Sequence, residues 1–322
     1  MDQPQAPSLS VILIVRDSYE TIAKTIKHLK AQTVREKLEI VIVTKSADAL
    51  HIPAEDVAPF AGVQVESVGE IRTVGAAYAA GVRRATAPVV VFGEDHSYPQ
   101  SDWAEWLLRD HQQSWAAVGP VVHLANPERV TAVADFLVGY GEWAGLNKPR
   151  QVDHLPGHNS SYKRALLLEY GEHLGTWLQA ESLLHWDLRR KGHRLFLEPA
   201  ATTRHVCFTH FSSFLRIQFL VGRDFAAFRA RNERWPLTRR IAFTLAAPLI
   251  PMVRMKRILQ RHKMGPSVLG AVFIGLLSDG IGQFLGYLFQ QPADEIINYE
   301  LERERFNREQ DAKSARSRAA AN

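Results

Sequence analysis

An acidic turn that contains a histidine, Glu94-Asp95-His96, holds the residues best suited to chemistry in this chain. It directly follows residues 88–92, a β-prone run typical of a buried strand, and Gly93 lets the backbone turn sharply at the end of that run. Glu94 and His96 stand two residues apart, so a carboxylate oxygen and an imidazole nitrogen can converge on one divalent cation at the carboxyl edge of a sheet. A cation held there would bridge a diphosphate. The alternative is a solvated turn that only ends the strand, since short acidic turns are common.

Two further regions contain polar residues that suit catalysis or binding. Residues 155–164 form a turn-rich stretch that leads into a predicted helix at 165–170. Glu181 opens another predicted helix, where the helix dipole stabilises the charged form of a carboxylate. That placement is typical of an N-terminal helix cap, and a general base there needs other negative charge nearby. His205 follows a predicted strand at 194–198, and a single histidine after a strand is more often structural than a metal ligand.

The elements that would position these residues alternate between strands and helices. The sequence predicts strands at 9–15, 38–43, 63–68 and 88–92, with helices at 19–32 and 74–84. Strand, helix and strand at this spacing form a right-handed crossover in a mostly parallel sheet. The fold class is therefore α/β, with helices flanking a Rossmann-like sheet. Neither Gly-x-Gly-x-x-Gly nor Gly-x-x-x-x-Gly-Lys occurs, which argues against a dinucleotide-binding or P-loop protein.

Composition indicates a globular chain with an anionic partner. Of the 322 residues, 46% are hydrophobic and 23% are charged, and the formal net charge is +5. The excess of positive charge is concentrated in residues 229–240 and 254–263, beside hydrophobic segments. That placement favours an anionic membrane surface over a nucleic-acid groove, so we expect no nucleic-acid partner. The single cysteine, Cys207, excludes an internal disulfide and favours a reducing compartment, and we expect no secretory signal.

Residues 8–210 resemble the family 2 glycosyltransferases of the GT-A fold in the order and spacing of five segments. The first two segments are the first strand with the turn after it and the glycine-containing helix after Arg72. The Glu94-Asp95-His96 turn stands where the family has Asp-x-Asp. Residues 157–164 stand where the family has the acceptor-side Gly-x-Asn, and Glu181 stands where it has the second acid of Glu-Asp. The resemblance implies an inverting enzyme that transfers a sugar from a nucleotide-sugar donor to a glycan or lipid-linked acceptor. It also implies a divalent metal cofactor, Mn²⁺ or Mg²⁺.

The same resemblance implies roles for individual residues of this chain. Glu181 would be the catalytic base, with Asp95 and Glu172 as the next residues to test for that role. The implied metal ligands are Glu94, His96 and His205. The implied donor-binding residues are Arg16, Asp17, Glu20, Arg72 and Asp95. The implied acceptor-side residues are His158, Asn159 and Arg164.

The chain departs from the family pattern at several positions. Thr44-Lys45-Ser46 stands where the family usually has an acidic pair after the second strand, so the nucleotide base is not predicted. A glutamate and a histidine in place of two aspartates lower the negative charge of the metal turn and favour manganese-like ions. Alanine at 180 removes one carboxylate of the usual pair. The processive signature Gln-x-x-Arg-Trp is absent, so we expect a non-processive enzyme.

The last third of the chain has a different character. Residues 241–253 are apolar, but as a helix they would reach only about 20 Å against a hydrocarbon core of about 30 Å. Residues 266–289 are long enough to span, yet Asp279 lies inside them, and a central aspartate costs about 2.5–3.5 kcal/mol on insertion. We therefore predict a membrane-embedded or in-plane helical hairpin on the cytoplasmic face of a membrane, with a soluble helical subdomain as the alternative. Glycines in this stretch favour close helix packing.

The resulting domain prediction has three parts. Residues 1–210 form the GT-A domain, residues 211–291 form a helical, membrane-associated region, and residues 292–322 form a charged tail. Two other functions stay open beside sugar transfer. One is a nucleotidyltransferase, for which Val15-Arg16-Asp17-Ser18 makes a poor phosphate loop. The other is a catalytically silent, membrane-bound relative, which the altered metal turn would permit.

Overall fold

The computed structural model describes residues 6–292, which belong to two compact units. The first unit comprises the chain up to Ala125 together with Trp143–His205. The second comprises Asn126–Glu142 and the chain from Val206 on. The predicted domain boundary at residue 210 lies close to Val206, from which the rest of the chain belongs to the second unit. The sequence did not predict that the short segment 126–142 also belongs to the second unit. From residue 293 on, the predicted charged tail lies outside the described residues.

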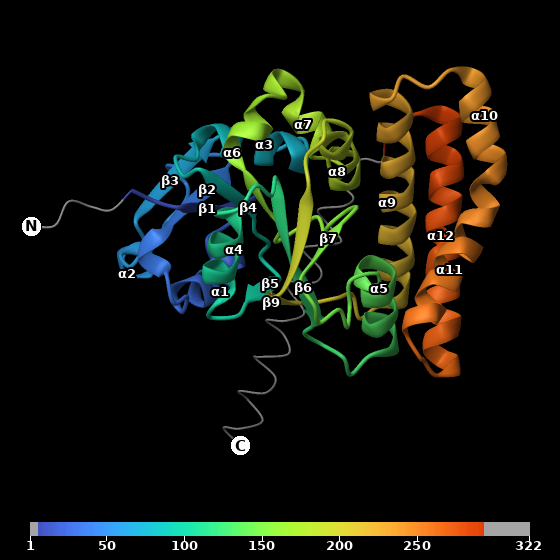
Figure 1. The fold of residues 1–322 in the computed structure, drawn as a ribbon, viewed down its shortest axis with the longest axis horizontal. Coiled ribbons are helices and arrows are strands. Elements are labelled where there is room, and N and C mark those ends of the chain that lie inside the picture. The colour runs from blue at the N-terminus through green and yellow to red at the C-terminus, as the bar shows by residue number, and fades with distance from the viewer. Residues whose placement is uncertain (1–5, 293–322) are drawn as a thin grey trace, which may run out of the picture. The chain divides into compact units, whose positions relative to one another are not determined.

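The first unit is built on one nine-stranded sheet with the order β3-β2-β1-β4-β8-β6-β9-β5, and β7 pairs with β9 (Figure 1). The strands are β1 (Leu9–Val15), β2 (Leu38–Thr44), β3 (Gly62–Ser67), β4 (Val89–Phe92), β5 (Ser97–Pro99), β6 (Ala117–Leu124), β7 (Arg150–Val152), β8 (Ser161–Lys163) and β9 (Leu195–His205). The pairings make β1 to β4, β6 and β9 run in one direction, with β5, β7 and β8 opposite. The predicted fold class, a mostly parallel α/β sheet, is confirmed.

Helices of the first unit cover both faces of this sheet. They are α1 (Glu20–Lys30), α2 (Ala54–Val57), α3 (Val74–Arg84), α4 (Trp103–His111), α6 (Arg164–Leu168), α7 (Leu174–Trp177) and α8 (Glu181–Arg190). Side chains alternate along a strand, so Val11 and Leu13 of β1 pack into one core cluster with α1 and α4. Ile12 points the other way, into a second cluster with α3 and α8. This explains why β1 reads as a continuous apolar run, since both of its faces are buried.

The strand that carries His205 is longer than the sequence predicted. The predicted strand at 194–198 took Pro199 as its end, but β9 continues to His205. Its register with β6 shifts between Pro120 and Val121, where Glu198 pairs with Pro120 and Thr202 pairs with Val121. The intervening residues form a bulge, and a proline is tolerated there because no ladder hydrogen bond is required of it. The bulge therefore brings His205 to the end of a strand rather than into a loop.

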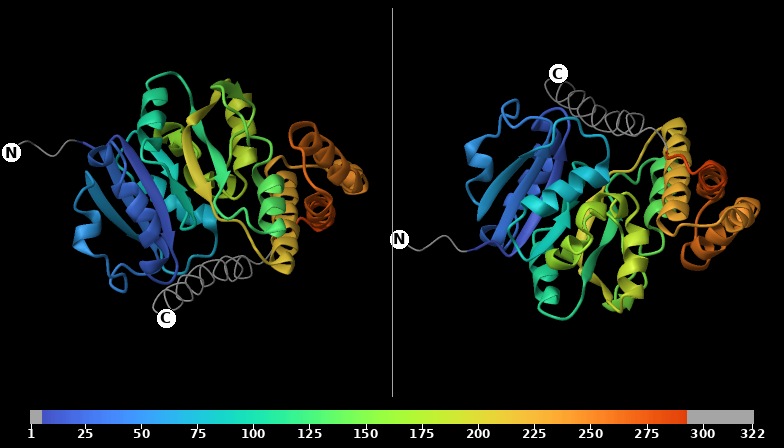
Figure 2. Two further views of the ribbon diagram at one scale, coloured as in Figure 1. Left: turned by 90° about the horizontal axis from the view of Figure 1, so that it is seen from below. Right: turned by 90° about the horizontal axis from the view of Figure 1, so that it is seen from above.

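The second unit is helical. Its helices are α5 (Val130–Tyr140), α9 (Phe211–Asn232), α10 (Leu237–Ala246), α11 (Ile250–Arg261) and α12 (Pro266–Phe289), and a short 3₁₀ turn (Ala247–Leu249) joins α10 to α11. Helix α12 lies between α9 and the α10–α11 pair and also contacts α5 (Figure 2). Its bounds coincide with the predicted apolar segment 266–289. Among the described residues, α12 alone is long and apolar enough to cross a membrane, a weak indication because buried core helices meet the same criteria.

Glycines let α12 approach α9 closely, as the sequence predicted. A Cβ atom on Gly282 would lie 2.1 Å from the carbonyl oxygen of Phe219, and one on Gly286 would lie 2.3 Å from the carbonyl oxygen of Arg223. Such distances are impossible for a real side chain, so these positions require glycine. Gly270, by contrast, faces open space. The aspartate inside the helix is also accommodated, because Asp279 is buried and its Oδ2 accepts a hydrogen bond from Nη1 of Arg254 at 2.8 Å.

Candidate active site and metal centre

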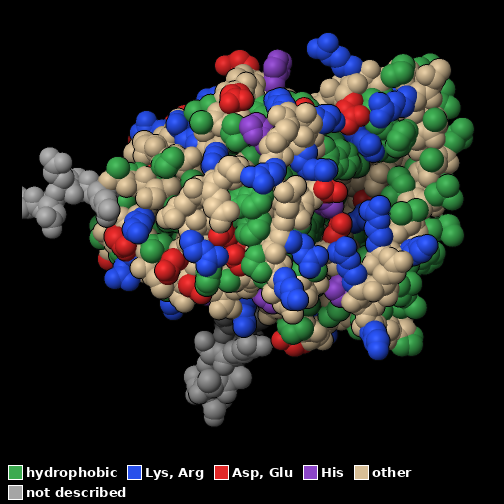
Figure 3. Space-filling model, viewed as in Figure 1, with side chains coloured by type: hydrophobic (Ala, Val, Ile, Leu, Met, Phe, Trp, Pro, Cys, Tyr) green, Lys and Arg blue, Asp and Glu red, His purple; other side chains and the backbone are tan. Residues whose placement is uncertain are grey.

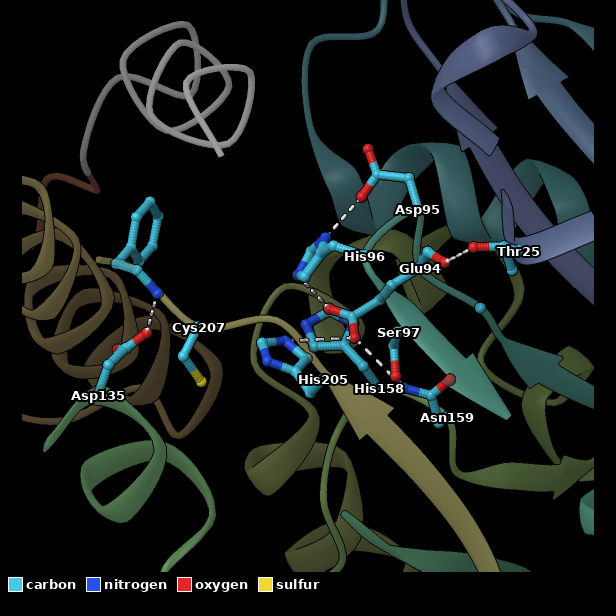
Figure 4. A network of polar contacts seen from close by, with 12 residues as sticks. Thr25, Glu94, Asp95, His96, Ser97, Asp135, His158, Asn159, His205 and Cys207 are labelled. Atoms are coloured by element: carbon cyan, nitrogen blue, oxygen red, sulfur yellow. Dashed lines mark hydrogen bonds and ion pairs between the residues drawn. The ribbon is translucent and has the colours of Figure 1, made fainter. Parts of the chain in front are cut away.

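A carboxylate and two imidazoles meet at the carboxyl end of β4. Glu94 and His96 lie in the turn between β4 and β5, and His205 is the last residue of β9, which pairs with β5. Oε1 of Glu94 lies 3.5 Å from Nε2 of His96, and its Oε2 lies 3.6 Å from Nε2 of His205. The three ligand atoms fall within 4.8 Å of one another (Figure 4). This is the cluster that the sequence resemblance implied, and we call it the Glu94 cluster.

Hydrogen bonds from other parts of the fold hold Glu94 in place. Nδ2 of Asn159 donates to Oε2 of Glu94 at 3.2 Å and to Oγ of Ser97 at 2.9 Å. The backbone is fixed as well, because Oγ1 of Thr25 donates to the carbonyl oxygen of Glu94 at 2.8 Å. The side chain of Glu94 is only 7% exposed, which excludes the solvated-turn interpretation for this residue. Burying a carboxylate without hydrogen-bond partners is costly, and these hydrogen bonds offset that cost.

Asn159 can reach Glu94 because of its unusual backbone. Its φ is 63°, in the left-handed region that asparagine tolerates better than most residues. Its backbone N–H donates to the carbonyl oxygen of Phe92 at 2.8 Å, which fastens the 157–159 loop to the end of β4. The sequence resemblance implied an acceptor-side role for Asn159. The structure gives it a direct contact with a candidate metal ligand.

Asp95 orients the imidazole of His96. Oδ1 of Asp95 lies 2.5 Å from Nδ1 of His96. An ionised carboxylate can only accept a hydrogen bond, so Nδ1 is the donor and carries the proton. In the neutral ring Nε2 then keeps its lone pair, and Nε2 is the atom that faces Glu94. A carboxylate behind a metal-binding histidine commonly fixes the ring in this way, so Asp95 is placed to act through His96.

A third histidine lies between the Glu94 cluster and Glu181. Nδ1 of His158 lies 3.5 Å from Oε1 of Glu94 and 4.0 Å from Oε1 of Glu181. Glu181 is the first residue of α8, as the sequence predicted, and its side chain is 17% exposed. The two carboxylates of the predicted site therefore share one imidazole. Gly157 makes room for this arrangement, because a Cβ atom there would lie 2.8 Å from Cδ of Glu181.

Beneath Glu181, a buried tyrosine and histidine support the start of α8. The hydroxyl of Tyr162 lies 2.7 Å from Nε2 of His185, and the two rings stack. Burial lowers the pKa of His185 to about 3, so the ring is neutral. Its Nδ1 accepts a hydrogen bond from the backbone N–H of Leu155, so Nε2 carries the proton and donates to the hydroxyl of Tyr162. Burial, and next the charge of Glu181, raise the pKa of Tyr162 well above its usual value, so the hydroxyl keeps its proton. Neither residue was predicted to have this role, because Tyr162 is one residue of the turn-rich stretch 155–164 and His185 lies within the apolar pattern of a helix.

The predicted donor-binding residues lie at the same sheet edge or beside it. Arg16 and Asp17 follow β1, whose carboxyl end is adjacent to that of its parallel neighbour β4. Glu20 begins α1, and the hydrogen bond from Ser18 lowers the pKa of its carboxyl group. Arg72 is largely exposed, and its Nε lies 3.4 Å from Oε2 of Glu70. The roles of these residues in donor binding stay predictions.

Arg164 has a helix-capping position in the structure. Its Nε donates to the carbonyl oxygen of Val82 at 2.8 Å, and its Nη2 donates to that of Arg83 at 3.0 Å. These carbonyls belong to the last turn of α3, where backbone acceptors lack partners within the helix. Arg164 thus ties α6 to α3, and its predicted acceptor-side role stays a prediction.

A mostly parallel α/β sheet with a carboxylate and imidazole cluster at its carboxyl edge is an arrangement that can bind a phosphorylated ligand through a divalent ion. The family profile described as glycosyl transferase family 2 matches residues 10–171, which is half of the chain. The chain belongs to glycosyl transferase family 2 and is a glycosyltransferase. Among curated proteins, none matched the sequence significantly.

Solved structures similar to this chain include two other glycosyltransferases. A crystal structure of GalNAc-T7 with UDP, GalNAc and Mn²⁺ superposes with a TM-score of 0.48 at 14% identity, over 62% of this chain. The match covers 43% of the GalNAc-T7 chain, so this chain corresponds to less than half of that protein. Residues 1–349 of S. aureus TarS in complex with UDP superpose with a TM-score of 0.44 at 13% identity, over 86% of this chain and 89% of that one.

Proposed function

We propose that the protein is an inverting, non-processive glycosyltransferase that moves a sugar from a nucleotide-sugar donor to a hydroxyl group of a glycan. The observation that carries the proposal is the position of His158, within 3.5 Å of Glu94 and 4.0 Å of Glu181. This position supports a single site that contains both the proposed base and the proposed metal ligands. Membership of glycosyl transferase family 2 favours sugar transfer over nucleotidyl transfer.

The residues of the Glu94 cluster fit a divalent metal ion. One carboxylate oxygen and two imidazole nitrogens offer ligand atoms within 4.8 Å of one another. A mixed oxygen and nitrogen donor set suits Mn²⁺ better than Mg²⁺, which prefers oxygen ligands alone. When bound, the ion would neutralise the charge that develops on the departing nucleoside diphosphate. Asn159 and Asp95 would keep Glu94 and His96 in the orientation that binding requires.

Glu181 is the residue we propose as general base. Its carboxylate accepts the proton of the acceptor hydroxyl while the acceptor oxygen forms a bond to the anomeric carbon of the sugar. The bond from that carbon to the diphosphate oxygen breaks in the same step, so the configuration at the carbon inverts. The carboxylate of Glu94, which lies near the same Nδ1 atom of His158, supplies the second negative charge that a base at a helix N-terminus requires.

A panel of nucleotide sugars, tested with and without Mn²⁺, provides the experiment. We expect the wild-type protein to release nucleoside diphosphate from one donor class and to need the metal ion. Glu181→Gln keeps the shape of the side chain but removes the proton acceptor, so donor binding should persist while turnover falls by about two to four powers of ten. Glu36→Gln, which changes an exposed carboxylate of the same unit, is the matched control.

Two results would contradict the proposal. Near-normal transfer by Glu181→Gln would show that another residue acts as the base. Absence of turnover by the wild-type protein across the whole panel, with bound nucleotide detectable, would favour a catalytically silent relative. Transfer of a nucleotidyl group instead of a sugar would show a different reaction at the same sheet edge.

A further inference from the structure

An exposed apolar stripe runs along the helices α10 and α11 of the second unit. Its members recur about every fourth residue from α10 through the 3₁₀ turn into α11, so they lie along one side of these helices. Each is between 45% and 73% exposed: Leu237, Ile241, Leu245, Leu249, Met252 and Val253. Figure 3 shows hydrophobic side chains gathered over this part of the molecule. Exposed apolar surface of this extent marks an interaction site.

The same region has an unbalanced charge. Between residues 234 and 278 the sequence has eight lysines and arginines and no aspartate or glutamate. Four of these cations are exposed on α11 or just after it: Lys256, Arg257, Arg261 and Lys263. Within the described part of the chain, no ion pair joins Lys256, Arg257 or Lys263 to a carboxylate. The surface next to the apolar stripe is therefore positively charged, and within the described residues no carboxylate pairs with these three cations.

The structure favours surface docking over a transmembrane span for this region. In α12, Asp279 is 3% exposed and bonded to Arg254, and Gln283 donates to the same carboxylate at 2.9 Å. Arg254 also donates to the carbonyl oxygen of Val138 in α5 at 2.9 Å. These contacts make α12 the packed centre of the helical unit. Helix α12 also exposes apolar side chains, among them Ile281, but the longer exposed stripe beside the cations is that of α10 and α11.

We infer that this stripe docks on an anionic lipid bilayer, with α10 and α11 lying in the plane of the membrane. An amphipathic segment binds a membrane in this way when its apolar side chains enter the headgroup boundary and its lysines and arginines meet anionic lipid. Charge argues against the other obvious occupant, since a second copy of this chain would bring the same four exposed cations, on α11 or just after it, to the same surface. The acceptor would then be a glycan linked to a lipid, a consequence that rests on the proposed function.

Flotation of the full-length protein with vesicles tests the docking surface. We expect it to float with vesicles of mixed phosphatidylcholine and phosphatidylglycerol, and much less with phosphatidylcholine alone. Leu245→Glu should lower partitioning at least about tenfold, because a leucine no longer enters the lipid. Leu168→Glu, which changes an exposed leucine of the α/β unit, is the matched control and should float like the wild type.

The cations are tested separately. Lys256→Glu combined with Arg257→Glu should lower partitioning by at least about 25-fold at low salt, since each cation contributes about fivefold. Arg35→Glu combined with Lys148→Glu changes the net charge equally at exposed positions of the α/β unit and should have little effect. Wild-type protein that stays with the lipid-free fraction, or stripe variants that float normally, would overturn the inference.

Two further outcomes would replace the inference. A dimer that Leu245→Glu converts to a monomer without vesicles would make the stripe a self-association surface. Protein that resists extraction from cell membranes by alkaline carbonate would indicate a spanning helix. Vesicle binding requires no sugar donor, so its failure would leave the proposed transferase reaction untouched.

Discussion

Gly157→Ala should impair catalysis without unfolding the protein. In the wild type, a Cβ atom at residue 157 would lie 2.8 Å from Cδ and Oε2 of Glu181 and 3.1 Å from Oε1. Non-bonded carbon atoms prefer about 3.5–4.0 Å, so the carboxylate has to move by about 1 Å. The added Cβ atom meets only the end of the flexible Glu181 side chain, and the φ angle of Gly157 is not in the left-handed region, so alanine can adopt it. The displacement therefore costs little stability.

A shift of about 1 Å at a catalytic group lowers the rate by about 100-fold, or about 2.7 kcal/mol in the activation free energy. We expect kcat of Gly157→Ala to fall by this amount, with the KM for the donor nearly unchanged and the free energy of unfolding within about 0.5 kcal/mol of wild type. Gly62→Ala, where a Cβ atom meets nothing within 4 Å, is the control. Wild-type turnover by Gly157→Ala would refute the assignment of Glu181 as the base.

Three other predictions test the surroundings of the site. Asn159→Ala and Asn159→Gly should both lose metal-stimulated turnover, but in urea unfolding only the alanine variant should show the added cost of about 1–2 kcal/mol for a left-handed φ. Tyr162→Phe leaves the Nε2–H group of the buried His185 without its acceptor and should cost about 1–3 kcal/mol in the same assay, whereas an unchanged unfolding midpoint would contradict that hydrogen bond. Burial lowers the pKa values of His185 and His111 to about 3, so the unfolded chain binds more protons below pH 6.5. Unfolding free energy should therefore fall as pH drops from about 6.5 towards 3, by up to about 1 kcal/mol per pH unit for each ring, and His185→Phe should flatten that slope.

Strand and helix periodicity was sufficient to predict the parallel half of the sheet. The predicted helix at 74–84 and the apolar segment at 266–289 match α3 and α12 at both ends, because each is bounded by a clear change in residue type. Strand β6 and the antiparallel β8 were not predicted. Both strands form because they pair with strands that are distant in the sequence. The local pattern of residue types does not predict such pairing.

The candidate site was predicted in part for a related reason. Glu94, His96 and His205 follow strands at the carboxyl edge, so the family pattern was enough to associate them. The neighbours that hold Glu94 come from other elements, and Thr25 in α1 is an ordinary polar position in its own helix. Arg164 also has a contact that the family pattern did not predict, because it caps α3, while its acceptor-side role stays a prediction. Tertiary contacts, rather than residue type, decide such roles.

Pulsed electron paramagnetic resonance of bound Mn²⁺ tests the central claim most directly, because it detects nitrogen nuclei that coordinate the ion. The Glu94 cluster predicts couplings to imidazole nitrogens from His96 and His205 in the wild-type protein. His205→Ala should remove part of the nitrogen signal and lower donor turnover, while His123→Ala, a histidine of β6 outside the cluster, should leave both unchanged. Mn²⁺ that binds with no nitrogen coupling, or with couplings unaffected by His205→Ala, would contradict the proposed metal centre.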